Sequence, residues 1–297
     1  MTVEKLVIKP VTLEESKLIH EWGESEGWNS GVHDWKTIFH ANSDGFLVGH
    51  LGNKPICCIA IFRYEYQVAF IGWYYVLTEY RGKGYGLTMF NHAMKLLKSY
   101  NIGLNAVPAQ EGNYAKIGFL KSYDNVLYEG EIAEDLHHTH NLKHMQFRSL
   151  NQIGADKASR FEYEHTGILR LKWWKAWLDQ PDLHSLALIT DDQTILAIAS
   201  SRLNNDNSYS ISHLYATDII YAEAILTEIL LMMKATEGSS HDINFDIMLI
   251  SKNLNTKVFI ETFNLQFSES STRMWTGGPP TNTEVNNIYA AGSSESG

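Results

Sequence analysis

Three glycines at alternate positions, between a strand-like run and a helix-like run, constrain this chain more than any other feature. The run Gln67–Leu77 is nearly continuous in apolar and aromatic residues, as expected for a strand buried on both faces. The turn Tyr80–Gly86, YRGKGYG, follows it, and the helix-like stretch LTMFNHAMKLLK comes directly after. Glycine permits unusual dihedrals and the close approach of a ligand, and the first N–H groups of a helix lack partners inside it. With the helix dipole and the cations Arg81 and Lys83, the turn predicts a phosphate-binding site.

The spacing of the glycines excludes two common phosphate loops. A Walker loop requires Gly-x-x-x-x-Gly-Lys, and Leu77 stands where its first glycine should be. The dinucleotide fingerprint Gly-x-Gly-x-x-Gly fails at Leu87 when it starts at Gly82, and at Met89 when it starts at Gly84. The pattern that fits the turn is Arg-x-x-Gly-x-Gly.

This pattern resembles the GNAT family of N-acetyltransferases, in which the turn binds the pyrophosphate of acetyl-CoA through backbone amides. The run VLTEYRGKGYG is similar to the family's hydrophobic-x-Pro-Glu-Tyr-Arg-Gly-x-Gly pattern, with Thr78 in place of the usual Pro. YAKIGF, Tyr114–Phe119, is similar to the family's Tyr-x-Lys-x-Gly-Phe segment. EWGESEGWNSGVHDW, Glu21–Trp35, and the ending RMWTGGPP…IYAAGSSESG resemble a two-domain subgroup, the YitH-like acetyltransferases. The resemblance therefore spans nearly the whole chain.

The order of predicted elements recurs along the chain. A strand pair, a strand, a helix and a strand precede residues 132–144, with two further strands near Leu120 and Leu127, and the same order follows. This indicates a diverged structural repeat. The resemblance implies a mixed α/β (α+β) fold of two tandem GNAT-like domains, each a mixed, mostly antiparallel sheet flanked by helices. The expected parts are a catalytic domain at 1–131, a linker at 132–144 and a degenerate GNAT-like domain at 145–297.

The resemblance also implies a cosubstrate, acetyl-CoA. Backbone N–H groups near the end of the long strand would polarise its thioester carbonyl, and aimed donors of this kind stabilise developing oxyanion charge. The residues expected to bind this cosubstrate are Val76, Leu77, Arg81, Gly82, Lys83, Gly84, Tyr85 and Gly86.

Two protons must move in such a reaction. An alkylammonium with a pKa of about 10.4 must lose a proton, and the leaving thiolate benefits from an acid. By resemblance Tyr114 is that acid, and the alternative is a ring that only packs against the sheet. Glu65, near the start of the long strand, is the candidate base. Glu26, His33, Asp34 or a water relay remain open as alternatives.

The segment Glu21–Trp35 is expected to shape the acceptor pocket through Trp28, Asn29 and Asp34. The alternative is a fixed loop, with Trp28 as a core anchor and Asp34 as a helix N-cap. In the second half the corresponding turn reads SHLYATDIIYAEA and lacks the glycines and the arginine. Asp218 there is placed to cap the helix and to repel an anion, so this half is expected to cover the acceptor side without binding CoA.

Charge and composition limit the partners. The 297 residues include 34 acidic and 24 basic side chains, a formal net charge of −10. This argues against a nucleic-acid partner and is compatible with a cationic substrate. No run approaches the roughly eighteen apolar residues of a membrane span, and no signal peptide is visible, so no membrane partner and a cytoplasmic location are expected. Cys57 and Cys58 are expected to be buried, reduced thiols. The histidines of residues 132–144 are expected in a solvated linker rather than at a metal, and the tail is expected to be partly mobile.

The function hypothesis is an acetyl-CoA-dependent N-acetyltransferase. It would move the acetyl group by direct attack of a primary amine of a small-molecule or peptide acceptor, without a metal, as a monomer or homodimer. The alternatives are an acyl-CoA-binding pseudoenzyme or regulatory module without turnover, and an interaction module that binds no cofactor.

Overall fold

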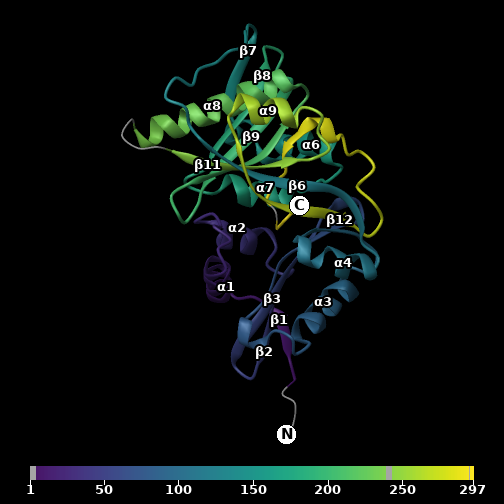
Figure 1. Ribbon diagram of the computed structural model, residues 1–297. Helices are drawn as coiled ribbons and strands as arrows, with labels where there is room; N and C mark the ends of the chain where they lie inside the picture. Colours follow the sequence, from purple (N-terminus) through teal and green to yellow (C-terminus); the bar gives the residue numbers. More distant parts are fainter. Residues whose placement is uncertain (1–4, 239–242, 294) are drawn as a thin grey trace.

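The computed structural model describes residues 5–238, 243–293 and 295–297, and its two halves repeat one order of elements (Figure 1). The first half contains β1 (Val7–Pro10), α1 (Leu13–Ser25), α2 (Asp34–Ala41), β2 (Phe46–Leu51), β3 (Lys54–Arg63), η1 (Glu65–Gln67), β4 (Val68–Val76), η2 (Thr78–Tyr80), α3 (Tyr85–Leu96), β5 (Asn101–Ala106), α4 (Pro108–Lys116) and β6 (Leu120–Glu131). The second half contains β7 (Met145–Ser149), α5 (Leu150–Ile153), α6 (Ala155–Thr166), α7 (Leu171–Leu178), β8 (His184–Thr190), β9 (Ile195–Leu203), β10 (Tyr209–Ala216), α8 (Ile219–Glu237), β11 (Asn244–Ile250), α9 (Thr256–Thr262), β12 (Gln266–Trp275), η3 (Val285–Asn287) and β13 (Ile288–Ala290). The recurrence predicted from the sequence is therefore present in the structure.

A single sheet runs through both halves. Its order is β1-β2-β3-β4-β5-β12-β6-β11-β10-β9-β8-β7, and β13 pairs with β10. The pairs β4–β5 and β10–β11 are parallel, and the other pairs of the described chain are antiparallel. The predicted fold class, a mixed and mostly antiparallel sheet with flanking helices, is confirmed.

The last long strand of each half lies beside the other half's sheet. β6 pairs with β11, β12 pairs with β5, and β6 and β12 also pair with each other. The prediction of two strands near Leu120 and Leu127 is wrong, because both residues lie in the one strand β6. Its 12 residues span about 40 Å, long enough to leave the first half and reach β11. The division at residue 131 stays a prediction, since strand pairing continues across it.

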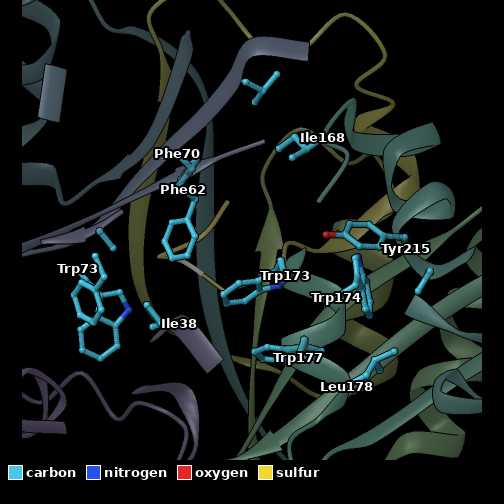
Figure 2. Packing of buried hydrophobic residues seen from close by; sticks show 14 of the residues in the cluster. Ile38, Phe62, Phe70, Trp73, Ile168, Trp173, Trp174, Trp177, Leu178 and Tyr215 are labelled. Carbon is cyan, nitrogen blue, oxygen red and sulfur yellow. The ribbon is translucent and has the colours of Figure 1, made fainter. Parts of the chain in front are cut away.

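Three apolar clusters hold the layers together. One lies between the sheet and α3 with α4 in the first half, and a second lies between the sheet and α8 with α9 in the second half. The third lies between the halves and is rich in aromatic rings (Figure 2). There Trp173 of α7 meets Phe62 of β3 edge to face, with ring centroids 5.7 Å apart. No helix of the described residues is long and apolar enough to cross a membrane.

The two cysteines are free and buried on β3. Cys57 belongs to the cluster beneath α3, whereas Cys58 belongs to the cluster between the halves. Burial raises the pKa of the Cys57 thiol to about 11, so this thiol is protonated and unreactive at neutral pH. The prediction of buried, unpaired thiols is confirmed.

The segment of residues 132–144 contains no helix or strand, but it is not simply solvated. His138 and His140 lie 2.7 Å and 2.6 Å from Glu228 and Glu223 of α8, and each is only partly exposed. Lys234 of the same helix donates to the main-chain oxygen of Glu134 at 2.6 Å. These contacts bind the linker along α8. Among the described residues no group of three or more His, Cys, Asp or Glu side chains is arranged to hold a metal ion.

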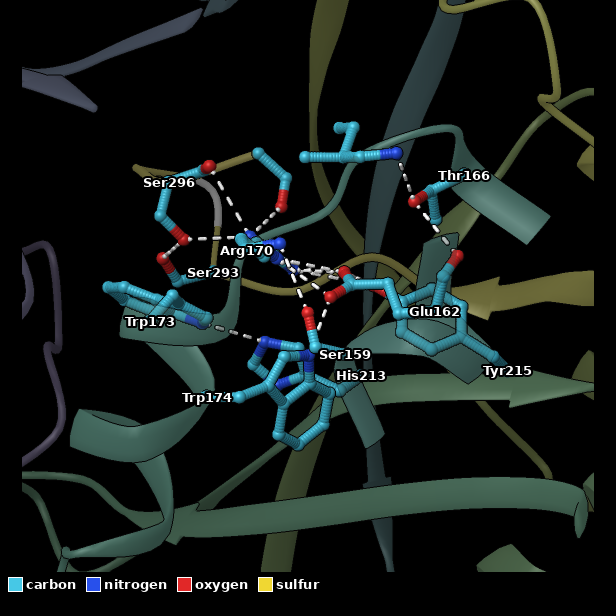
Figure 3. A network of polar contacts seen from close by, with 12 residues as sticks. Ser159, Glu162, Thr166, Arg170, Trp173, Trp174, His213, Tyr215, Ser293 and Ser296 are labelled. Atoms are coloured by element: carbon cyan, nitrogen blue, oxygen red, sulfur yellow. Dashed lines mark hydrogen bonds and ion pairs between the residues drawn. The ribbon is translucent and has the colours of Figure 1, made fainter. Parts of the chain in front are cut away.

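The tail is packed, contrary to the expectation of mobility. Ser293 and Ser296 are buried, and the fully buried Arg170 donates to Ser296 Oγ at 3.2 Å and to the main-chain oxygen of Gly297 at 2.7 Å (Figure 3). Arg170 is itself paired with Glu162 at 2.5 Å. Small serine and glycine residues fit here because they follow a narrow path between the halves, where each buried polar group finds a partner.

Candidate active site

The glycine turn forms an open cradle between β4 and α3. Gly82 and Gly84 have φ values of 72° and 85°, and Gly84 is the N-cap of α3. A Cβ added at either position would meet no atom within 4 Å. Within the described residues, the N–H groups of Gly82, Lys83 and Gly84 have no hydrogen-bond acceptor. Glycine is therefore required by the backbone conformation, and the donors it leaves uncovered suit an anion.

Gly86 has a different role. A Cβ on this residue would lie 2.6 Å from the hydroxyl of Tyr74 and 3.1 Å from a methyl group of Val76. Because Gly86 has no Cβ, the first turn of α3 can lie directly on β4. The helix N-terminus is thereby fixed beside the end of the strand.

The two cations of the turn bind neighbouring parts of the chain. Arg81 donates from Nε to the main-chain oxygen of Val76 at 2.8 Å and from Nη2 to Glu26 at 3.0 Å. Lys83 donates to the main-chain oxygen of Glu79 at 2.7 Å. The Arg81–Glu26 pair is exposed, 46% and 31%, and exposed pairs contribute about 0–1 kcal/mol. Breaking the ion pair between Arg81 and Glu26 therefore costs little free energy, and Arg81 can bind an anion instead.

Beyond the turn, β4 separates from β5 at an irregularity in the strand. The two strands pair from Val68 with Asn101 to Ile71 with Leu104 and no further. Trp73 then has a φ of +45°, where the register with β3 also shifts, and this bulge bends the strand. The edge of β4 that follows, from residue 74 to residue 76, points toward the space where β5 has moved away.

Val76 and Leu77 are the two apolar residues predicted to contact the cofactor. The main-chain oxygen of Val76 points away from β3, whereas the N–H of Leu77 is bonded to β3. The main-chain oxygen of Val76 faces Arg81, on the side away from β3. The N–H of Leu77 donates to the main-chain oxygen of Ile56 on β3 at 2.9 Å, so it is already used. The open edge therefore belongs to Val76 rather than to Leu77.

The second half has the same bulge but a closed edge. β10 and β11 pair only as far as Ile211 with Ile247, and His213 then has a φ of +53°. β13 pairs with β10 immediately afterwards, at Leu214 and Tyr215. The turn into α8 is short, and the Asp218 carboxylate accepts from the N–H of Ile220, as the sequence predicted. In the second half, β13 and Asp218 thus occupy the space that corresponds to the open space in the first half.

Tyr114 lies on α4, across the separation from β4. Its ring packs against Phe90 of α3 and Phe119, with centroids 5.7 Å and 5.9 Å away. Its side chain is partly exposed, and burial of the rest raises the pKa of its hydroxyl above 10.0. The hydroxyl has no hydrogen-bond partner in the described part of the chain, so it is available to a ligand.

The loop after α1 brings a carboxylate to β4. Glu26 accepts from the hydroxyl of Tyr75 at 2.9 Å, in addition to its contact with Arg81. These two donors, Tyr75 first, lower the pKa of Glu26 below 4.5. Trp28 lies edge-on to the rings of Trp73 and Tyr75, with centroids 5.5 Å and 5.9 Å away. The exposed ring of Trp28 and the Glu26 carboxylate therefore border the same stretch of β4.

Asp34 does not lie with them. It is buried, accepts from the N–H of Gly31 at 3.0 Å and pairs with Arg202 of β9 at 3.3 Å. α2 begins at Asp34 itself, with His33 in the N-cap position, so the alternative of an Asp34 N-cap is wrong. Asp34 instead fastens this loop to the second half, where Val32 N also donates to the main-chain oxygen of Leu203.

A cavity of about 900 Å³ opens between the halves. Glu26, Trp28 and Asn29 line it from the first half, and residues of β6, β10, β11 and β12 line it from the other side. Asp34, Glu65 and Tyr114 are not among its lining residues. Glu65 is exposed in η1, at the opposite end of β4 from the glycine turn, and its N–H contacts the main-chain oxygen of Leu169. A strand of nine residues separates that end from the turn by about 30 Å.

The candidate site residues that the sequence did not predict are those whose position depends on the fold. Tyr75 carries the donor to Glu26, but a tyrosine within an apolar strand gives no signal of its own. Asp206 and Ser208, in the turn between β9 and β10, reach the cavity from 180 residues away; Ser208 meets Asn29 at 3.4 Å. Glu26 was one of several alternatives for the base, and in the structure it contacts Tyr75 of β4.

Comparisons with known proteins agree with this geometry. Residues 10–123 match the model of the Acetyltransferase (GNAT) family. The holothin acyltransferase of Pseudoalteromonas sp. (strain SANK 73390) is 26% identical over 208 residues, which cover 70% of this chain and 68% of that enzyme.

Solved structures show the same fold. A Pyrococcus horikoshii protein assigned as an acetyltransferase superposes with a TM-score of 0.76 at 18% identity, over 100% of this chain and 98% of that one. A tandem GNAT protein of the clavulanic acid biosynthesis pathway superposes with a TM-score of 0.62 at 9% identity, over 91% and 98%. These similarities concern the fold alone, and assignment to the YitH-like subgroup stays a prediction. The part of the chain that carries the glycine cradle and the separated strands, residues 10–123, thus matches the GNAT family model, and the chain as a whole is similar to an acyltransferase.

Proposed function

We propose that the protein transfers an acetyl group from acetyl-CoA to a primary amine by direct attack. The observation that carries the proposal is the pair of open features in the first half: uncovered N–H donors at Gly82–Gly84 and a free β4 edge at Val76. Members of the GNAT family generally use acetyl-CoA, and both features suit its parts. The second half, in which Asp218 and β13 close the equivalent places, supplies an internal contrast.

The cradle fits a diphosphate. Its glycines leave space rather than side chains above the N–H groups, and the N-terminus of α3 adds the positive end of a dipole. Arg81 is held beside it by an exposed contact that an anion can replace. Gly82, Lys83, Gly84, Tyr85 and Gly86 would line the diphosphate, while Val76 would meet the thioester arm.

The acetyl thioester supplies an activated acyl carbon at the gap between β4 and β5. A neutral amine attacks this carbon, the N–C bond forms and the C–S bond breaks, with the electron pair leaving on sulfur. Tyr114, whose raised pKa keeps it protonated at neutral pH, would give its proton to that sulfur. The proton that the nitrogen loses as the amide forms would then return to the Tyr114 oxygen through water. Positioning of the amine against the carbon supplies much of the rate.

The acceptor amine must first lose a proton, and Glu26 is the carboxylate that lies nearest to the reacting stretch of β4. It accepts from Tyr75 at 2.9 Å and lines the cavity, so an ammonium group there would meet its charge. Its lowered pKa makes it a weak base, so it would position the ammonium group, and a water relay would carry the proton away before the neutral amine attacks. Glu65 would then have no part in the reaction, because it lies at the far end of β4.

This proposal assigns the halves different roles. Residues 1–131 would carry the cofactor site, and residues 145–297 would form the opposite wall of the acceptor cavity. The contacts of Asn29 with Ser208 and of Asp34 with Arg202 support this arrangement, because they fix the acceptor loop against that wall.

The test is release of CoA thiol from acetyl-CoA in the presence of a panel of primary amines, followed by detection of the acetylated product. Acetylation of at least one amine, at a rate well above hydrolysis, is expected. Tight binding of CoA without thiol release from any amine would instead favour a cofactor-binding protein without turnover. Absence of CoA binding would refute the cofactor site itself.

A further inference from the structure

The wall of the cavity opposite residues 26–30 carries more acidic than basic side chains. Five carboxylates lie on it: Glu129, Glu131, Asp206, Asp246 and Glu269. None of the five forms an ion pair within the described chain, and Arg202 is the one cation among the described lining residues. Arg202 pairs through Nη1 with Asp34 at 3.3 Å and with Asn204 at 2.8 Å, while its buried Nε has no hydrogen-bond partner in the described chain. Elsewhere carboxylates such as Glu223, Glu228 and Asp191 have cationic or histidine partners.

Buried hydroxyl groups in the same cavity also lack partners. Ser30 and Ser212 line the cavity and are only 6% and 4% exposed. Neither hydroxyl has a hydrogen-bond partner in the described part of the chain. A hydroxyl can accept from an ammonium group, so these two hydroxyls are available to a ligand in the cavity.

No residue of β4 is among the described lining residues of the cavity, but Glu26, which does line it, contacts Tyr75 of β4. The main chain of Glu295, another lining residue, is in direct contact with Gly72. The ring of Trp28 lines the cavity with 39% of its surface exposed, and an indole face attracts cations. A volume of about 900 Å³ holds a molecule much larger than a simple alkylamine.

We propose that the acceptor is a small molecule with at least two protonated amino groups. One amine would react beside Glu26, and the other would lie against the carboxylates of the opposite wall and the two serine hydroxyls. This inference deepens the proposed function and rests on it. Aliphatic polyamines and amino sugars share the required chemistry, so both are included in the test.

The first experiment compares acceptors that differ in one charge. The pairs are 1,4-diaminobutane with n-butylamine, and a sugar carrying several amines with glucosamine, each with acetyl-CoA at low and high salt. We expect kcat/KM to favour the multiply charged member by about tenfold at low salt, as one or two additional ion pairs would give, and the preference to fall as salt rises. The pair with the larger difference in kcat/KM shows whether the acceptor is an aliphatic polyamine or an amino sugar. Equal kcat/KM within both pairs, with acetylation still occurring, would overturn this inference and leave the proposed function standing.

The second experiment removes charge from the wall. The double variant Glu129→Gln with Glu131→Gln should lose most of the preference for the diamine over the monoamine in kcat/KM. Glu261→Gln is the matched control, because this exposed residue of α9 is outside the cavity and its loss changes the net charge in the same direction. An unchanged preference in the double variant, or an equal loss in the control, would contradict the proposal.

Discussion

Replacement of Gly84 tests the cofactor cradle most directly. Gly84 has a φ of 85° and open space around its missing Cβ, so Asp and Asn both fit there sterically. Both tolerate this left-handed conformation better than most residues, and we expect each to lower stability by about 1 kcal/mol. The two variants have nearly the same shape and differ by one charge. Their comparison therefore isolates electrostatics from backbone strain.

The size of the effect follows from Coulomb's law. At about 4 Å, two unit charges interact by about 1 kcal/mol in water and about 4 kcal/mol at an effective dielectric constant of 20. The cradle is partly solvent-exposed, so Gly84→Asp should bind CoA roughly 5- to 1,000-fold more weakly than Gly84→Asn. An aspartate can also occupy the free N–H groups itself, as Asp218 does at the start of α8. Both effects act in the same direction.

The assay is isothermal titration of CoA into the two variants at low and high salt, with thermal unfolding as the control for stability. The difference in affinity should shrink at high salt, because the added carboxylate is exposed. Affinities of Gly84→Asp and Gly84→Asn at low salt that both equal the affinity of the unaltered protein would refute the diphosphate site. An equal loss of CoA affinity in both variants would show that backbone strain alone weakens binding.

The remaining predictions concern the acid, the pH dependence and the closed second half. Tyr114→Phe should lower kcat by about 10²-fold with little change in CoA affinity, measured by thiol release and titration; a wild-type kcat would exclude Tyr114 as the acid. Since burial raises the pKa of Tyr114 above 10.0, the acid keeps its proton as pH rises, while the acceptor loses its own with a pKa of about 10.4. The logarithm of kcat/KM should therefore rise by about one per pH unit from pH 7 to 9, and a flat profile would contradict this order of events. Asp218→Ala should destabilise the protein by about 1 kcal/mol through loss of a cap, without altering CoA affinity. A weaker affinity there would mean that the second half takes part in cofactor binding.

The sequence predicts local features correctly where residues close together in the chain determine them. The glycine turn, the Asp218 cap and the buried Cys57 depend on residues a few positions apart, and each lies in the structure as its pattern indicated. The recurrence of elements was readable for the same reason, because each half repeats its own periodicities.

Contacts between distant segments were not readable. Asp34 resembles a helix cap in the sequence, and its partner Arg202 is known only once the second half folds against the first. Glu65 and Glu26 are both candidate bases in the sequence, and only the folded path of β4 shows that they lie near its opposite ends. The tail looked mobile because its residues are small and polar, but Arg170 and Glu162, more than a hundred residues earlier, bury it.

The exchange of β6 and β12 means that neither half contains a complete set of neighbours for its own sheet. A fragment ending at residue 131 would leave β5 without β12 on one side, and β6 without both of its partners. Fragments cut in the linker are therefore expected to aggregate when made separately and to assemble when made together. Because the strands of one half complete the sheet of the other, we expect the two halves to unfold together in a single cooperative transition.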